Sequence, residues 1–278
     1  MKFLLEKDIF DDGICRKFSD RVKEHDSTGK VIKYRPFDVD QDFNGMFPGE
    51  DVYFYGSINC MQRLQYQTKC GLLDFNLIDY CPWNVFRASV IYSRFGKHAL
   101  AHNYCVATVN EVLKGTTYFF MRYGLGMDDC FRIFCKSDDG DKKFNGDVYN
   151  VVELEKHLQM NLDLDYIKET DLLIVATPTP IQREYRVVVS LNGIVTGSKY
   201  MDNGNLVRNP IDILPDKVYD YVLFIMNQYH HYPAPMFVID IAETASDTLS
   251  VIETGSINVC GLYGCDVNKI VDELITLN

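Results

Sequence analysis

Two carboxylates near the C-terminal end of the chain have a spacing that suggests metal chemistry. Two apolar, β-branched runs, 236–242 and 249–255, are separated by a short polar turn, a pattern typical of a β-hairpin. Each run is interrupted by one acid, Asp240 in the first and Glu253 in the second. In one antiparallel register these two acids lie directly opposite each other, where like charges are destabilising.

Two explanations of this acid pair remain open from the spacing alone. A bound cation can bridge the carboxylates, and Mg²⁺ held by one or two carboxylates usually also binds substrate phosphates. Alternatively, the register differs, and each acid is solvated or paired with a basic side chain. The first explanation predicts a Mg²⁺ site at Asp240 and Glu253.

The composition excludes several classes of protein. A hydrophobic content of 47% in 278 residues is enough for one large core or several smaller lobes. The formal net charge of −11 argues against binding to nucleic acid or to an anionic membrane surface. No apolar run is long enough for a signal peptide or a transmembrane helix. We therefore expect a cytoplasmic protein without a membrane or nucleic-acid partner.

The cysteines and histidines do not indicate a zinc site. Nine cysteines are scattered without a disulfide framework, which favours a reducing cytoplasm. Neither the pair Cys260 and Cys265 nor the pair His230 and His231 has the ligand spacing of a zinc site. We expect no metal role for these residues.

Hydrophobic periodicity and turn residues predict an α/β chain. In the N-terminal part we expect a strand at 51–57 and a helix up to about Thr68. The segment 101–114 has nearly helical spacing, and 118–152 shows a β pattern. Further along, we expect strands at 131–135, 147–152, 171–178, 181–190 and 194–200, and helices at 153–162, 218–229 and from Asp266, as the N-cap, to the end.

A polar loop at 136–146 is a candidate phosphate-binding segment. It carries two glycines and three lysines between two expected strands. Backbone N–H groups and ammonium charges in such a loop can close over phosphates. An ordinary solvated hairpin tip is the alternative. The chain has neither a Walker P-loop nor a complete dinucleotide fingerprint, because Gly124 and Gly126 lack the third glycine.

The strand at 181–190 carries three charged residues. Glu184 and Arg186 share one face, because strand side chains alternate, and they can pair with each other. Arg183 lies on the opposite face, which makes it a candidate for binding substrate only.

Taken in order, these segments resemble the ATP-grasp fold, in particular the clade named for two arginines and one lysine, which is common in bacteria and phages. The segment 134–146 resembles the family's Phe-x-Arg-Pro…Lys-x-Phe-x-Gly loop, and this match places Lys142 at the ATP-binding lysine. The segments 184–186 and 197–200 resemble its Glu-aromatic-Arg and Gly-Ser-x-Tyr strand pair. Asp240, with Glu253, Asn258, Gly261 and Tyr263, resembles its metal-binding end.

The resemblance implies a fold of α+β lobes with an N-terminal pre-ATP-grasp lobe. We expect that lobe at 1–100, a small lobe with the phosphate-covering loop at 101–175, and a C-terminal lobe with the metal site at 176–278. It also implies ATP and Mg²⁺ as cofactors, with ATP clamped between two lobes.

The resemblance assigns roles to particular residues of this chain. The implied catalytic residues are Arg186 and Lys142. The implied ATP-binding residues are Lys136, Lys142, Val175, Ala176, Thr177 and Glu184. The implied metal ligands are Asp240, Glu253 and Asn258. The implied substrate-binding residues are Arg183, Ser198 and Tyr200.

The chain departs from the family pattern at three positions. Lys136 stands where the loop usually has arginine, which keeps the charge but loses the bidentate fork. Gly255 replaces the asparagine of the Glu-x-Asn metal pair, so that Asn258 would have to supply the third ligand. Thr179 stands where a lysine often follows the hinge strand.

The resemblance implies a carboxylate–amine ligase that works through an acyl phosphate and releases ADP and phosphate. Its substrates would be small-molecule or peptide carboxylates and amines. The departures at Lys136 and Gly255 favour a rival function, a non-catalytic ATP-binding module that regulates a partner protein. Retention of Asp240, Glu253, Lys142 and Arg186 favours the enzyme.

Overall fold

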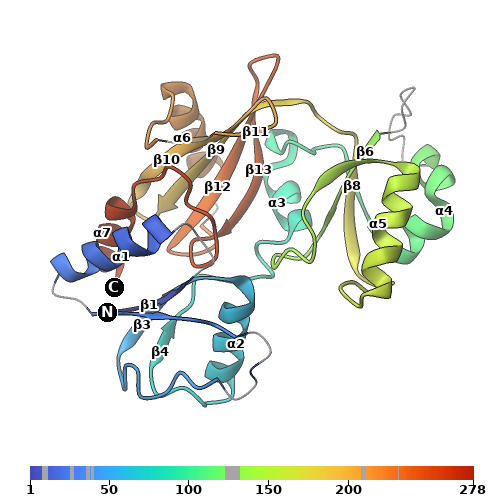
Figure 1. The fold of residues 1–278 in the computed structure, drawn as a ribbon. Coiled ribbons are helices and arrows are strands. Elements are labelled where there is room, and N and C mark those ends of the chain that lie inside the picture. The colour runs from blue at the N-terminus through green and yellow to red at the C-terminus, as the bar shows by residue number, and fades with distance from the viewer. Residues whose placement is uncertain are drawn as a thin grey trace. The chain divides into compact units, whose positions relative to one another are not determined.

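The computed structural model describes residues 1–7, 12–25, 28–35, 38, 41–122, 132–207, 211–230 and 232–278 (Figure 1). These residues form two compact units. The first unit contains Met1–Pro82, Arg183–Asp240 and Thr254–Asn278. The second contains Trp83–Gln182 and Ile241–Glu253.

A parallel sheet begins the first unit. Its four strands have the order β2-β1-β3-β4, and each neighbouring pair is parallel. Parallel strands need crossover connections, and the helix α2 (Ile58–Lys69) connects β3 to β4. The expected strand at 51–57 and the helix after it are confirmed. The strands are β1 (Lys2–Glu6), β2 (Gly29–Ile32), β3 (Asp51–Tyr55) and β4 (Asn76–Ile78).

One hydrophobic core joins this sheet to elements from the C-terminal part of the chain. The helices α1 (Asp12–Glu24) and α7 (Val267–Leu277) contribute to the same buried cluster as β1 and β3. Asp266 caps α7 as expected, since its side chain accepts a hydrogen bond from the N–H of Asn268 at 2.9 Å. The fully buried members of this core include Phe3, Leu5, Phe18, Val22, Tyr53, Tyr55, Val188, Met236, Ile257, Leu262, Ile270, Val271 and Leu274.

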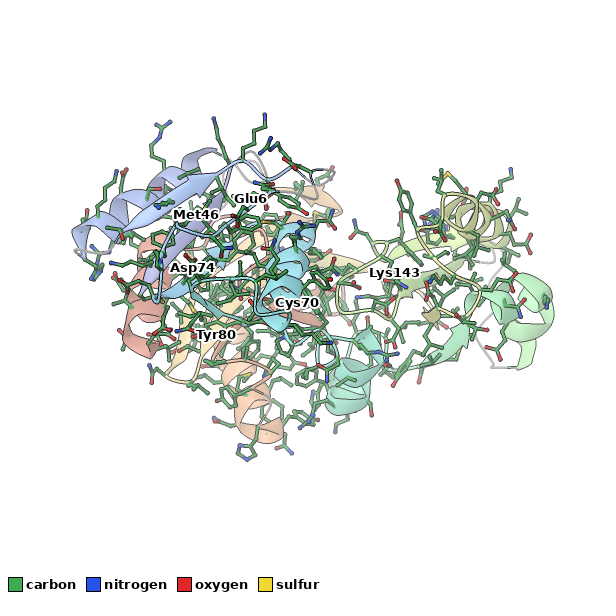
Figure 2. All side chains as sticks on the ribbon, turned by 90° about the horizontal axis from the view of Figure 1, so that it is seen from below. Glu6, Met46, Cys70, Asp74, Tyr80 and Lys143 are labelled. Carbon is green, nitrogen blue, oxygen red and sulfur yellow. The ribbon has the colours of Figure 1, made fainter. Side chains whose placement is uncertain are left out.

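The Glu6 side chain packs against the Gly56-Ser57 turn that follows β3 and accounts for the glycine there. The backbone N–H of Ser57 donates to the Glu6 carboxylate at 2.6 Å, and Glu6 lies at the end of β1 in this sheet (Figure 2). A Cβ atom at Gly56 would lie 2.5 Å from the Cβ of Glu6, so that only glycine fits there. Burial raises the pKa of Glu6, while the hydrogen bonds from Ser57 lower it less.

A second sheet has the strand order β11-β10-β9-β12-β13. Both expected hairpins are present, β9 with β10 around Gly193 and β12 next to β13. The helix expected at 218–229 is also confirmed, as α6 (Asp216–Tyr229). The strands are β9 (Ile181–Ser190), β10 (Gly193–Asp202), β11 (Asn205–Leu206), β12 (Met236–Thr244) and β13 (Leu249–Ser256).

The second unit is built on an antiparallel sheet of order β5-β8-β6-β7. Its core contains residues from these strands and from two helices, α4 (Val109–Arg122) and α5 (Val151–Asp163). The short helices α3 (Ala88–Phe95) and η1 (Gly96–His98) precede β5. The strands are β5 (Tyr104–Thr108), β6 (Arg132–Ser137), β7 (Asp147–Asn150) and β8 (Leu172–Ala176).

The helical interpretation of 101–114 is wrong in its first half. Tyr104–Thr108 forms β5 and pairs along its whole length with β8, and the helix begins only at Val109. Edge pairing with a buried strand overrides the weak helical spacing, since secondary-structure propensity yields to tertiary context.

The β interpretation of 118–152 needs correction at both ends. Residues 118–122 belong to α4, and 123–131 lie outside the described residues, including Phe131 and both Gly124 and Gly126. At the other end, β7 stops at Asn150, whose side chain accepts a hydrogen bond from the N–H of Glu153 at 2.9 Å. This capping box starts α5 two residues earlier than expected.

The expected lobe boundaries at 1–100, 101–175 and 176–278 stay a prediction. Each sheet takes its strands from one of these ranges, apart from Ala176, but each compact unit draws on more than one. Within the described part of the chain, the helices are too short or too polar to span a bilayer.

The contact between α1 and α7 gives a pH-dependent prediction. Arg21 on α1 binds both carboxylate oxygens of Asp272 on α7, each at 2.7 Å. These hydrogen bonds lower the pKa of Asp272 below its ordinary value of 3.8. A lowered carboxylate pKa stabilises the fold above the ordinary pKa, and this stabilisation is lost as the pH falls.

We therefore expect Asp272→Asn to reduce the free energy of unfolding at pH 7 by about 0.2–1 kcal/mol, as is usual for exposed pairs. The difference from wild type should shrink as the pH falls below about 4, measured by urea unfolding. Asp20→Asn is the control, since Asp20 only pairs with the exposed Lys23 at 3.5 Å. A difference that stays constant down to pH 2.5 would contradict this role of Asp272.

Candidate functional site

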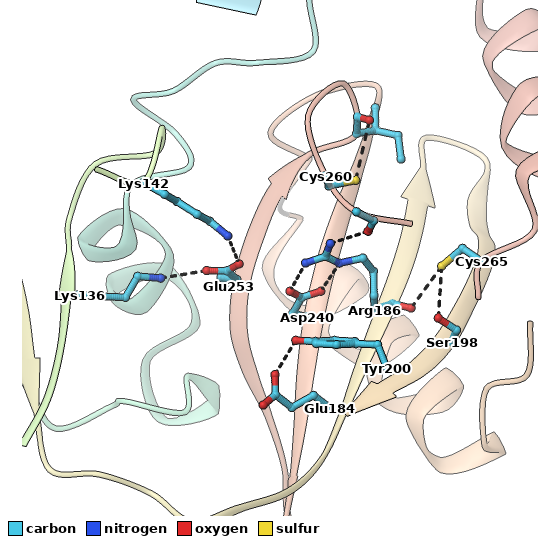
Figure 3. A network of polar contacts seen from close by, with 12 residues as sticks. Lys136, Lys142, Glu184, Arg186, Ser198, Tyr200, Asp240, Glu253, Cys260 and Cys265 are labelled. Carbon is cyan, nitrogen blue, oxygen red and sulfur yellow. Dashed lines mark hydrogen bonds and ion pairs between the residues drawn. The ribbon is translucent and has the colours of Figure 1, made fainter. Parts of the chain in front are cut away.

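Two lysines converge on Glu253 in the second unit (Figure 3). The Lys136 Nζ donates to one carboxylate oxygen at 2.9 Å, and the Lys142 Nζ donates to the other. The Glu253 side chain is only 16% exposed, so this charge cluster is partly withdrawn from water. Burial alone would raise the pKa of Glu253, but the two ammonium charges outweigh it and hold that pKa well below its ordinary value.

The two lysines are positioned by different parts of the fold, Lys136 by a strand and Lys142 by the loop after it. Lys136 lies within β6, opposite Ile174 of β8, rather than in the loop where it was expected. Lys142 follows in the turn, with a φ of 53° that non-glycine residues adopt rarely. A Cβ atom at Gly146 would lie 3.2 Å from the Cβ of Lys136, so glycine lets the end of the loop pass close to β6.

Asp138 anchors the loop to the start of α3. This contact was not predicted from the sequence. Its fully buried carboxylate accepts hydrogen bonds from Arg87 Nη2 at 2.6 Å and from Ser89 N–H at 2.6 Å. Two residues on, a Cβ atom at Gly140 would lie 2.1 Å from the carbonyl oxygen of Trp83. No local signal links these partners, because Arg87 and Asp138 are 51 residues apart.

The second half of the loop has its own contacts within this unit. Lys143, labelled in Figure 2, binds Asp171 at 2.7 Å. The ring of Phe144 packs edge-on against His157 of α5 with a centroid distance of 5.1 Å. The loop is thus attached on both sides of Lys142.

Arg186 forms a buried ion pair with Asp240 in the first unit (Figure 3). The guanidinium binds both carboxylate oxygens, from Nε at 2.9 Å and from Nη2 at 2.6 Å, and Nη1 donates to the Gly261 carbonyl at 2.6 Å. Both side chains are more than nine-tenths buried. Burial alone would lower the pKa of Arg186, but the charge of Asp240 outweighs it and raises that pKa.

Two tyrosines lie against this ion pair. Tyr200 and Tyr263 stack with centroids 4.5 Å apart, and the guanidinium carbon of Arg186 lies 4.9 Å from the ring centre of Tyr263. The Tyr200 hydroxyl donates to Glu184 at 2.5 Å. Burial raises the pKa of Tyr200, so this hydroxyl stays a donor. Tyr263 belongs to the C-terminal motif of the sequence, which does not indicate this contact.

The structure therefore pairs each of the two acids with basic side chains, which is one of the alternatives left open by the sequence. Arg186 pairs with Asp240, whereas the sequence also allowed it to pair with Glu184. The acids lie on neighbouring strands, β12 and β13, of one sheet. The metal roles of Asp240 and Glu253 stay predictions.

Two of the expected site residues have hydrogen-bond partners within the fold. The Asn258 amide donates to the Phe54 carbonyl at 2.7 Å, and its oxygen accepts from the Tyr80 N–H at 3.0 Å. Ser198 is fully buried and accepts from the Gly264 N–H at 3.3 Å. The metal role of Asn258 and the substrate role of Ser198 stay predictions.

The expected adenine-binding residues lie at the end of β8. Val175 and Ala176 are buried in the middle of the sheet, each paired with β5 on one side and β6 on the other. Thr177 is exposed directly after the strand. The backbone groups between Thr177 and the start of β9 are therefore outside the hydrogen-bond ladder of this sheet.

The expected substrate-binding residue Arg183 lies in β9, where it pairs in register with Asp202 of β10.

The donor chemistry fits Mg²⁺ in part. Carboxylate oxygens are the ligands that Mg²⁺ prefers, and each oxygen has more than one acceptor position, so a hydrogen bond does not exhaust it. Asp240 and Glu253 are therefore suitable Mg²⁺ ligands if their basic partners shift away from the carboxylates. No group of three His, Cys, Asp or Glu side chains with metal-binding geometry occurs among the described residues; His231 lies outside them.

Comparison with known protein families decides the family. Residues 124–272, more than half of the chain, match the ATP-grasp domain of R2K clade family 2. The chain belongs to this family. The ATP-grasp resemblance and fold expected from the sequence are thereby confirmed. No curated protein matches the chain in sequence.

Solved structures agree with the ATP-grasp fold along the whole chain. D-cycloserine synthetase DcsG is 12% identical with a TM-score of 0.66, and the match covers 100% of both chains. D-alanyl-alanine synthetase A from Vibrio cholerae is 12% identical with a TM-score of 0.61, covering 100% of this chain and 97% of that one. A RiPP-associated ATP-grasp ligase from Chryseobacterium gregarium, in complex with ADP and a leader and core peptide, is 13% identical with a TM-score of 0.58, covering 99% and 96%.

The Arg186–Asp240 pair gives a stability prediction for this ATP-grasp chain. Removing one partner of a buried ion pair leaves an uncompensated charge, which costs about 3–5 kcal/mol. We expect Arg186→Met to lower the free energy of unfolding by about this amount in urea titrations. Asp240→Asn should also destabilise the fold, so by itself it is not a clean test of metal binding.

The double variant Arg186→Met/Asp240→Asn is the control, because it removes both charges. It should recover part of the stability lost in Arg186→Met. If the two single losses simply add in the double variant, the buried pair does not couple the two strands.

Proposed function

We propose that this chain is a carboxylate–amine ligase that consumes ATP and releases ADP and phosphate. The observation that carries the proposal is the convergence of Lys136 and Lys142 on Glu253, because it gathers two cations at one carboxylate within a chain of the ATP-grasp family. Three of the similar structures are named as synthetases or ligases, which supports the same class of reaction here.

The chemistry proceeds in two steps. A substrate carboxylate oxygen attacks the γ-phosphorus of ATP, the bond to the β-phosphate oxygen breaks, and ADP leaves. The resulting acyl phosphate has a leaving group that the free carboxylate lacks. An amine then attacks the acyl carbon, loses a proton and displaces inorganic phosphate, which leaves an amide.

Phosphoryl transfer depends mainly on positioning and on compensation of the developing negative charge. We assign Lys142 and Arg186 to the phosphate oxygens, with assistance from Lys136. A guanidinium presents a planar fork, and an ammonium acts as a compact point charge, so the two types of cation suit different oxygens.

Asp240 and Glu253 would hold Mg²⁺, and the metal would add charge compensation and orient the phosphates. Asn258 is left out of this ligand set because its fully buried amide oxygen already accepts two hydrogen bonds, from the Tyr80 N–H and the Ser256 hydroxyl. The Mg²⁺ contribution therefore rests on two protein carboxylates.

The remaining assignments follow the family pattern. The backbone at Thr177 would hydrogen-bond to adenine beside Val175 and Ala176 at the end of β8, and Glu184 would complete the nucleotide site. Arg183 and Tyr200 remain substrate-binding candidates. Ser198 is dropped because it is fully buried and bonded to the backbone at Gly264.

We infer that the substrates are small or peptide carboxylates and amines. The similar structures include a synthetase of a small molecule and a ligase bound to a leader and core peptide. A net charge of −11 disfavours a nucleic-acid acceptor.

The first test of this proposal concerns Lys142. A charge-assisted hydrogen bond is worth about 1.5–3 kcal/mol, so Lys142→Ala should weaken ATP binding in Mg²⁺ by about tenfold or more. Lys143→Ala is the matched control, since the neighbouring lysine binds Asp171 instead. Isothermal titration calorimetry measures both constants. Equal losses in the two variants would argue against a direct role of Lys142.

The second test follows the nucleotide product. The wild-type protein is incubated with ATP, Mg²⁺ and pools of amino acids, peptides and metabolites, and the nucleotides are separated by chromatography. Substrate-dependent ADP and phosphate are the expected products. AMP and pyrophosphate would instead indicate adenylation and would contradict the acyl-phosphate mechanism.

One observation favours a second function. Lys136 replaces the arginine usual in the family loop and Gly255 the asparagine of its metal pair, so two groups of the expected phosphoryl-transfer site are changed. ATP binding without consumption in any pool would support this alternative, a non-catalytic ATP-binding module that regulates a partner protein.

A further inference from the structure

Glu253 holds the two lysines that the proposed function assigns to phosphates. Lys136 and Lys142 each donate to a different oxygen of this carboxylate, so both oxygens and both ammonium groups are engaged with one another. The Lys136 side chain is 10% exposed and that of Glu253 is 16% exposed, which strengthens their attraction relative to water. A nucleotide must compete with this carboxylate for the lysines.

The charges decide what can win that competition. The cluster of two lysines and one glutamate carries a net charge of about +1 instead of +2, and its negative charge lies between the cations. A metal-free nucleotide triphosphate would bring further negative charge towards Glu253. A divalent cation at Glu253 removes that repulsion and leaves the lysines without their carboxylate partner.

We propose that Glu253 is an electrostatic latch that keeps Lys136 and Lys142 from binding a nucleotide until a divalent cation takes over its carboxylate. This inference rests on the proposed function, which assigns these lysines to ATP. It adds that cation and nucleotide bind with positive coupling, and that the coupling passes through this one side chain. By linkage, the nucleotide strengthens cation binding by the same factor.

The surrounding fold lets the latch open by side-chain motion. Lys136 lies on β6 and is held in register with β8, so only its side chain needs to turn. The loop before and after Lys142 is fastened by contacts that do not involve Glu253, from Asp138 to Arg87 and from Lys143 to Asp171. Release of the lysines therefore does not require the loop to unfold.

The departure at Lys136 fits this role. Arginine is usual at this position of the family loop, and a guanidinium would hold a carboxylate bidentately. An ammonium makes a single-point contact with Glu253, which is easier to exchange for a phosphate oxygen. The substitution keeps the charge and loosens the latch.

The test measures binding of a non-hydrolysable ATP analogue by calorimetry, once in EDTA and once in Mg²⁺. In EDTA, Glu253→Gln should bind the analogue about tenfold or more tightly than wild type, within the usual range of coupling between two sites. The enhancement of binding by Mg²⁺ should be smaller in the variant than in wild type. Loss of charge repulsion alone would also give a gain in EDTA, but that gain would be equally large without Lys142.

Two controls separate the latch from a general effect of charge. Asp171→Asn removes an acid that binds Lys143 of the same loop and should leave affinity in EDTA unchanged. In Glu253→Gln/Lys142→Met, the gain relative to Lys142→Met should be smaller than in the single variant, because only Lys136 is then freed. Glu253→Ala serves as a second variant, and thermal unfolding without nucleotide identifies which of the two keeps the fold.

The outcomes distinguish this inference from the function on which it rests. If wild type binds the analogue in Mg²⁺ but Glu253 variants that keep the fold gain nothing in EDTA, the latch is refuted and the nucleotide site stands. An equal gain in Asp171→Asn also refutes it. If wild type binds no analogue under either condition, the proposed function fails and the latch fails with it.

Discussion

A carboxylate withdrawn from water needs a cation, and this constraint shapes the chemistry of the β12–β13 hairpin. Desolvation of an ion costs several kcal/mol, which only close pairing with good geometry offsets. Asp240 satisfies the constraint with a bidentate arginine, and Glu253 with two lysines. The basic side chains that a phosphate-handling site needs are thereby brought to acids that a metal can also use.

The two acids are compensated by different kinds of structure. Arg186 reaches Asp240 from a strand of the same sheet and is further bound by the carbonyl of Gly261. The three hydrogen bonds of this pair join β9, β12 and the segment after β13. Glu253 instead depends on side chains from β6 and from a turn, which can move without disturbing a ladder of backbone hydrogen bonds.

The structure shows different surroundings for two departures from the family pattern, Lys136 and Gly255. Lys136 retains a cation at its position and uses it on Glu253. Gly255 is not required by packing, because a Cβ atom there would meet its nearest neighbour, Val238 Cγ2, at an ordinary contact distance of 3.4 Å. The backbone packing around Gly255 therefore does not explain why glycine stands there. The amide of Asn258 joins β3 to the segment after β13.

Local patterns in the sequence were enough to predict much of the fold. The two hairpins and the helix capped by Asp266 follow from alternation, helical spacing and capping, which act over a few residues. Ordered motifs also identified the ATP-grasp family and the acids, lysines and arginine of the candidate site. In contrast, the strand at 104–108 was missed, because its partner β8 lies far along the chain.

Only the tertiary structure decided which charges pair. Lys136 and Glu253 are 117 residues apart, and Arg186 and Asp240 are 54 apart, so neither pair leaves a signal in the local sequence. The same holds for Asp138, whose partners Arg87 and Ser89 precede it by about fifty residues. Residue types determine which ions a chain can hold, but burial and the packing of distant strands determine which ion each carboxylate finds, because a buried charge is stable only where an opposite one is within hydrogen-bonding distance.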